Sequence, residues 1–168
     1  MQIRIRKGGG LAGLLFVAFI IAFMSFWGPE EPQVSDREVV TLVRLVDGDT
    51  ANFSTSSYGN VNVRFSGVDT PEVKHPTKGK EYYGEEASAF TASILTGAER
   101  IEIEWDLTQE PSHDRPIGIV WVDGVNLNLL LVREGYADLE YLEDSMPYAD
   151  DYREALKEAQ AEHKGLWN

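Results

Sequence analysis

Cysteine is absent from the chain, so the protein cannot rely on disulfide bonds for stability. This absence is compatible with an exported location and with an internal one. Histidine is scarce too, and the spacing of His75, His113 and His163 forms no zinc-binding pattern. A glycine-rich phosphate-binding loop is also lacking, because the run Gly8-Gly9-Gly10 opens an uncharged segment instead.

Basic residues are few: 15 Lys and Arg stand against 28 Asp and Glu, which gives a formal net charge of −13. This balance is unusual for a protein that binds nucleic acid, because such proteins normally show a basic footprint. Two interpretations stay open: the acidic residues form a solvated helix face that keeps the protein soluble, or they are an adaptation to high salt. The excess is concentrated late in the chain, at Glu140, Glu143, Asp144, Asp150, Asp151, Glu154, Glu158 and Glu162.

A long uncharged run lies at the N-terminus, from Gly8 to Trp27, behind Arg4, Arg6 and Lys7. Twenty helical residues span ~30 Å, enough to cross a bilayer. The basic side predicts a cytoplasmic N-terminus and a domain outside the cytoplasm. The run ends in bulky residues, whereas a cleaved signal peptide ends in small ones, which favours an uncleaved signal anchor over a secreted form.

The chain therefore divides into three parts. Residues 1–27 are the signal anchor or signal peptide, and residues 28–38, with two prolines and paired glutamates, are a linker. Residues 39–168 are long enough for one ordinary domain with its own hydrophobic core.

Within the domain, short strands alternate with helical patterns. Residues 39–46 are rich in β-branched side chains, residues 61–66 and 101–105 alternate apolar with polar, and residues 117–122 are apolar up to the hairpin signal Asp123-Gly124. Helical spacing appears over 83–94, 127–132 and 148–159. Mainly β structure with three packed helices, an α+β class, indicates a small closed barrel with the helices outside.

The candidate site comes from two blocks, Val46-Asp47-Gly48-Asp49-Thr50 and Arg64 to Glu72, with a second arginine, Arg115, on a later loop. Carboxylates and carbonyls are the ligands of hard cations such as Ca²⁺. Arginine clamps and a residue that activates water serve phosphoryl transfer. Each block alone is also typical of an ordinary turn, since Asp and Gly favour turns and Asp-Thr-Pro favours a capped turn. Their order and spacing favour the functional interpretation.

These blocks, in this order, resemble the staphylococcal nuclease (thermonuclease) family over roughly residues 39–168. The similar segments are VDGDT at 46–50, VRFSGVDTPE at 63–72, residues 74–90, DGVNLNLLLVREGYA at 123–137 and residues 152–167. The resemblance implies a five-stranded OB-fold barrel, whose face binds oligonucleotides. It also implies a Ca²⁺-dependent nuclease that acts on DNA or RNA, and we expect a monomer.

The resemblance also implies residue roles. Asp49, Asp69 and the Thr70 carbonyl correspond to calcium ligands, with Asp47 as a nearby outer acid. Glu72 corresponds to the residue that positions or activates water. Arg64 and Arg115 correspond to the phosphate clamp, and Tyr141 to a tyrosine that contacts the nucleotide.

The resemblance is incomplete around the second arginine. The family pattern Lys-Tyr-Gly-Arg is replaced by Ser112-His113-Asp114-Arg115, followed by Pro116, which disfavours a helical conformation of Arg115. We keep His113 as a candidate substrate contact. The second nucleotide-contacting tyrosine is replaced by Glu143. A non-catalytic OB-fold module that binds nucleic acid or a protein remains the alternative, although a module of that kind does not need the full set of acidic and arginine residues.

Overall fold

The structure is a computed structural model that describes residues 37–73, 79–112 and 114–168. These residues belong to one compact unit, Asp36–Asn168. The predicted membrane segment and most of the predicted linker lie outside the described residues. Within the described ranges, no helix is both long and apolar enough to cross a membrane.

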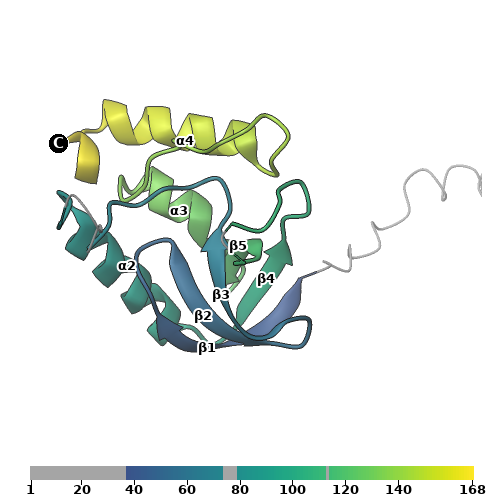
Figure 1. Cartoon of the computed structure of the whole chain (residues 1–168). Helices are drawn as coiled ribbons and strands as arrows, with labels where there is room; N and C mark the ends of the chain where they lie inside the picture. Colours follow the sequence, from purple (N-terminus) through teal and green to yellow (C-terminus); the bar gives the residue numbers. More distant parts are fainter. Residues whose placement is uncertain (1–36, 74–78, 113) are drawn as a thin grey trace, which may run out of the picture. The chain divides into compact units, whose positions relative to one another are not determined.

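The described chain forms a closed barrel of five strands (Figure 1). Strands pair antiparallel in the order β3-β2-β1-β4-β5, and a short parallel pairing between β3 and β5 closes the ring. This closure is the five-stranded OB-type barrel that the sequence analysis expects. The strands are β1 (Glu38–Leu45), β2 (Thr50–Thr55), β3 (Gly59–Phe65), β4 (Ile101–Trp105) and β5 (Ile117–Val122).

Alternating side chains fill the barrel. In β4, Ile101 and Ile103 are buried, while Glu102 and Glu104, which alternate with them, remain partly exposed. The alternation predicted for residues 61–66 holds for Val63 and Phe65, which are both buried. Burial of such apolar area is the main stabilising contribution to the domain.

Three helices pack around the barrel, as predicted: α2 (Gly84–Gly97), α3 (Leu127–Arg133) and α4 (Ala149–Ala161). The two-residue strand β6 (Val125–Asn126) forms the predicted hairpin with β5, with Asp123 and Gly124 both at positive φ. Asn126 then caps α3 by accepting a hydrogen bond from the Leu129 N–H at 3.0 Å. A 3₁₀ turn, η1 (Gly165–Trp167), follows α4.

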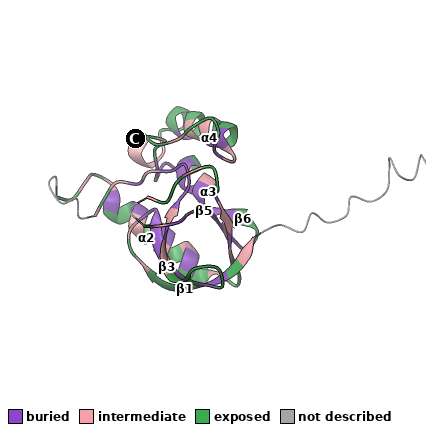
Figure 2. Cartoon of the chain, turned by 45° about the vertical axis from the view of Figure 1, so that its right-hand side comes forward, coloured by how far each residue is buried: buried purple, intermediate pink, exposed green. Residues whose placement is uncertain are grey.

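The acidic residues of α4 lie on its outer side, which is coloured as exposed in Figure 2. Its inner side carries Tyr152, Ala155 and Ala159, which are buried against the rest of the domain. The exposed acids are Asp150, Asp151, Glu154 and Glu158. This placement agrees with a solvated acidic face; whether that face is also an adaptation to salt stays a prediction.

Candidate active site

The turn between β1 and β2 fixes Asp49 inside the protein. The N–H groups of Val46 and Asp47 both donate to the Thr50 carbonyl, at 3.0 and 3.1 Å, and the Thr91 hydroxyl of α2 donates to the Gly48 carbonyl at 2.7 Å. Asp49 is only 1% exposed. The block Asp47-Gly48-Asp49 is thus a turn, and that turn delivers a carboxylate to a buried position.

Strand register brings Arg64 to this carboxylate. Thr50 and Arg64 are partners in the β2–β3 ladder, so Asp49, one residue earlier, lies beside Arg64. The Arg64 guanidinium bonds Asp49 through Nη1, and through Nη2 it bonds Asp69 at 2.6 Å and the Val68 carbonyl at 3.2 Å. One arginine therefore joins the two carboxylates predicted to hold a cation.

Thr70 completes the inner part of the site. Its N–H and its hydroxyl both donate to Asp49 Oδ2, at 2.8 and 3.2 Å, and it is 3% exposed. Thr50 and Arg64 donate to the other oxygen, Oδ1. Protein donors thus engage both oxygens of Asp49, whereas the side chain of Asp69 keeps 28% of its surface exposed.

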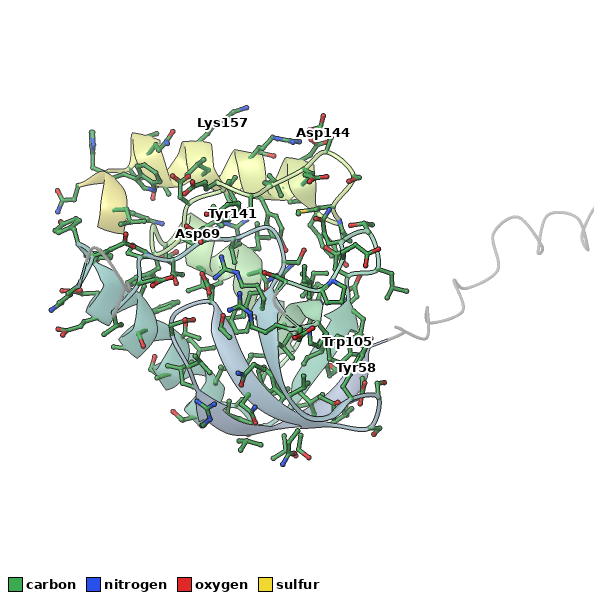
Figure 3. The ribbon with its side chains drawn as sticks, in the orientation of Figure 1. Tyr58, Asp69, Trp105, Tyr141, Asp144 and Lys157 are labelled. Carbon is green, nitrogen blue, oxygen red and sulfur yellow. The ribbon has the colours of Figure 1, made fainter. Side chains whose placement is uncertain are left out.

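Asp69 is tied to the segment that carries Tyr141. The N–H of Asp69 donates to the Asp138 carbonyl at 2.9 Å, and the reciprocal bond is 2.8 Å. Tyr141 lies three residues later on a turn closed by the Leu142 N–H and the Leu139 carbonyl, and it is 60% exposed. Figure 3 shows Tyr141 and Asp69 close together beneath α4.

Glu72 is held through its backbone, and no bond to its carboxylate is found within the described residues. Its N–H donates to a carboxylate oxygen of Glu81 at 2.9 Å, and its carbonyl accepts from the Glu81 N–H at 3.0 Å. Gly84 is required at the start of α2, because a Cβ there would come within 2.9 Å of the Pro71 and Glu72 carbonyls. The N-terminal end of α2 thus packs directly against the backbone of Glu72.

Arg115 comes from the long loop between β4 and β5. Its backbone forms a two-way bridge with Ser112, with both N–H···O distances at 3.0 Å. Its side chain rests on the same residue, through Nε to the Ser112 carbonyl at 3.1 Å and Nη2 to the Ser112 hydroxyl at 3.3 Å. The next residue, Pro116, accepts a bond from the Arg64 N–H at 3.1 Å, so the loop re-enters the barrel beside Arg64.

One cavity of about 710 Å³ joins the predicted site residues. Arg64, Asp69, Glu72, Arg115 and Tyr141 all line it, although they come from distant parts of the chain. Asp49 and Thr70 lie behind its wall, in contact with Arg64 or with each other. His113 lies outside the described residues, so its contact with substrate stays a prediction.

The electrostatics of the site follow from burial. Desolvation raises the pKa of Asp49 and of Asp69, and the neighbouring Arg64 guanidinium opposes that shift in both. Desolvation lowers the pKa of Arg64, but the charges of Asp49 and Asp69 outweigh it and raise that pKa overall. Arg64 is therefore a permanent cation between two carboxylates.

The donor set suits a hard cation. Asp49 and Asp69 both bond the Arg64 guanidinium, and Asp47 lies close enough to accept the Asp49 N–H at 3.3 Å. The side-chain atoms of these three residues that could bind a metal ion are all carboxylate oxygens. Across the described ranges, no group of three or more His, Cys, Asp or Glu side chains is arranged around a metal position. The predicted ligands, two carboxylates and a carbonyl, are of the oxygen class that Ca²⁺ takes, and a calcium ion at this position stays a prediction.

The sequence analysis did not identify several residues of the cavity wall. Glu110, Glu140 and Glu143 add three carboxylates to the rim, and Leu142 and Met146 supply apolar surface. Glu143 is noted in the sequence analysis only as one of the acidic residues and as the replacement of a nucleotide-contacting tyrosine. That correspondence and its position two residues from Tyr141 are the signals that could have indicated a place in the cavity wall.

Comparison with known families agrees with this geometry. The family model described as staphylococcal nuclease homologue matches residues 62–168. The chain belongs to this family. The resemblance seen in the sequence is thereby confirmed.

Curated relatives extend the match beyond the family model. The chain is 29% identical over 155 residues to a thermonuclease of Staphylococcus hyicus, covering 90% of each, and 29% identical over 166 residues to a thermonuclease of Staphylococcus intermedius, covering 98% of each. It is 33% identical over 132 residues to the SPbeta prophage-derived endonuclease YokF of Bacillus subtilis, covering 77% of this chain and 44% of that protein.

Proposed function

We propose that the domain is a calcium-dependent nuclease that hydrolyses phosphodiester bonds of DNA or RNA as a monomer. Membership of the nuclease family makes the chain a hydrolase of the nuclease class. The observation that carries the finer proposal is one cavity lined by Arg64, Arg115, Glu72 and Asp69, with Asp49 paired to Arg64 beside it.

Each side chain has a role in this proposal. Arg64 and Arg115 bind the phosphate oxygens and stabilise the charge that grows on them in the transition state, where preorganised donors are most effective. Glu72 accepts a proton from the attacking water or orients that water, because its carboxylate is exposed to the cavity. Tyr141 offers an exposed ring on which a base can stack.

Asp49, Asp69 and the Thr70 carbonyl would hold the calcium ion. When bound, the ion would supply positive charge to the phosphate oxygens. Arg64 pairs with both carboxylates in the structure, so it would have to give up part of that pairing to contact phosphate. The chain's own residues thus link cation binding to the release of one arginine.

The chain is expected to cut single-stranded DNA or RNA in millimolar Ca²⁺. Mg²⁺ should support the reaction poorly, because it demands a tighter octahedron than this carboxylate–carbonyl set provides. The assay follows release of short fragments from an end-labelled strand in each metal and in chelator. Folded protein that releases no fragments in Ca²⁺ would contradict the proposal and favour a non-catalytic binding module.

We further propose that residues 1–27 anchor the protein in the cytoplasmic membrane, with the domain outside the cytoplasm. The support is the uncharged run from Gly8 to Trp27 behind three basic residues. Protease added to the outside of intact cells with permeable outer layers should digest the domain, and the chain should fractionate with membranes. A mature protein free in the medium that begins after Trp27 would instead establish a cleaved signal peptide.

A further inference from the structure

A buried carboxylate stands at the end of β4, outside the chemistry proposed above. Asp106 is 4% exposed. Its Oδ1 accepts two bonds from Thr108, from the N–H at 2.9 Å and from the hydroxyl at 2.6 Å, and its Oδ2 accepts the Ser66 hydroxyl. No ion pair joins Asp106 to any described cation, so these hydrogen bonds alone offset the cost of burying it.

Ser66 is the fixed end of this connection. The sequence pattern placed it on the polar face of a strand, but it lies in the turn that follows β3 and is fully buried. Its N–H donates to the Gly118 carbonyl at 2.9 Å, and its carbonyl accepts from the Asn128 amide at 2.9 Å. Ser66 lies two residues after Arg64. A side chain that bonds Ser66 is therefore held at a fixed position relative to the strand that carries the first arginine.

Thr108 is the loop end of this connection. The loop between β4 and β5 has its two ends joined by the bond from the Asp106 N–H to the Ile117 carbonyl, 2.9 Å long. Thr108 begins the first half of the loop, which runs on to Ser112, and Ser112 supports the Arg115 guanidinium. The position of this half of the loop therefore decides where the second guanidinium points.

We propose that Asp106 is a positioning residue that sets the spacing between the Arg64 and Arg115 guanidinium groups. Its two oxygens connect the strand behind one arginine to the loop half that supports the other. The inference rests on the proposed phosphodiesterase function, in which both arginines bind the same phosphate. A misplacement of about 1 Å by a residue remote from the chemistry can cost ~10²-fold in rate.

A double-mutant cycle tests this role. Arg115→Ala should lower kcat about 10²-fold, because it removes charge stabilisation of the transition state. Asp106→Ala should lower kcat by roughly 10-fold or more with little change in KM, because Arg115 stays present but poorly aimed. The double variant should lose no more than Arg115→Ala alone, since Asp106 acts through that arginine.

Two further variants separate positioning from stability. Asp106→Asn should restore most of kcat, because its oxygen still accepts from Thr108 and its amide can donate to Ser66. Asp123→Ala is the matched control: Asp123 also accepts backbone N–H bonds, from Glu99 and Arg100 at 3.1 and 2.8 Å, but it lies on the β5–β6 hairpin away from Arg115. It should lower the melting temperature and leave kcat unchanged.

The inference is overturned if the losses from Asp106→Ala and Arg115→Ala multiply, or if Asp106→Ala lowers only the melting temperature. If Asp106→Ala does not fold, Ser66→Ala replaces it in the same cycle with the same expectation. If the wild-type chain cuts no nucleic acid, the proposed function fails first, and the cycle is repeated with binding of a 5′-phosphorylated dinucleotide as the readout. If the losses of dinucleotide affinity in Asp106→Ala and Arg115→Ala then multiply in the double variant, the positioning role is overturned independently of the proposed function.

Discussion

Replacing Arg64 by alanine is expected to lower turnover by roughly 10²- to 10³-fold, the cost of removing one preorganised donor from a transition state. The same replacement should also destabilise the protein in the absence of calcium. Arg64 neutralises two carboxylates, and Asp49 is buried with no other cation bonded to it within the described residues. Breaking a buried pair by removing one partner costs about 3–5 kcal/mol.

Calcium should reverse the second effect. Without the guanidinium, Asp49 and Asp69 are free to bind a cation, so Ca²⁺ should raise the melting temperature of Arg64→Ala more than that of the wild type. Turnover should stay low, because the phosphate contact is still missing. Thermal melting with and without millimolar Ca²⁺ measures this, with Arg44→Ala as the control, since Arg44 is an exposed arginine of β1. If calcium does not relieve the destabilisation of Arg64→Ala, the proposal that the cation binds the same two carboxylates as Arg64 is contradicted.

Replacing Glu72 by glutamine is expected to lower turnover by about 10²-fold, because glutamine cannot accept the proton of water. Calcium affinity and stability should change little. Glu72 is exposed, and the hydrogen bonds that position it run through its N–H and its carbonyl rather than its carboxylate.

Glu110→Gln is the matched control for this change. Glu110 is also exposed and lines the same cavity, so its replacement alters the local charge equally without removing a proposed base. Turnover and calcium binding by titration calorimetry are measured on both variants. Equal turnover of the two variants would show that the loss comes from charge alone and that Glu72 has no special role.

Much of the barrel was predictable because its strands carry local signals. The alternation at Ile101 to Trp105 and the Asp123-Gly124 turn each need only neighbouring residues to form. β2 was named by no sequence pattern, because Thr50-Ala51-Asn52-Phe53 mixes small and polar residues in a strand of the barrel wall. Its place follows from pairing with β1 and β3 on either side, which is a property of the whole barrel.

One part of the candidate site is local in the sequence, and another part comes together only when the barrel closes. Asp69, Thr70 and Glu72 come from one block. The meeting of Arg64 with the Arg115 loop depends on the β3–β5 pairing, for which the residues themselves carry no local signal. Ser66 shows the same limit, since the alternation did not indicate that β3 ends at Phe65 or that Ser66 is buried in the turn after it.

The most direct test of the central claim is the rate of strand cleavage measured as a function of Ca²⁺ concentration for the wild-type chain and for Asp69→Asn. Asp69 is the suitable position, because its side chain is partly exposed to the cavity, whereas Asp49 is buried in a network that also supports Thr50 and Thr70. The account predicts cleavage that saturates with calcium in the wild type and needs about 10-fold or more calcium in Asp69→Asn, since one carboxylate ligand has lost its charge. Cleavage that is independent of calcium, or an identical calcium dependence in both proteins, would contradict it.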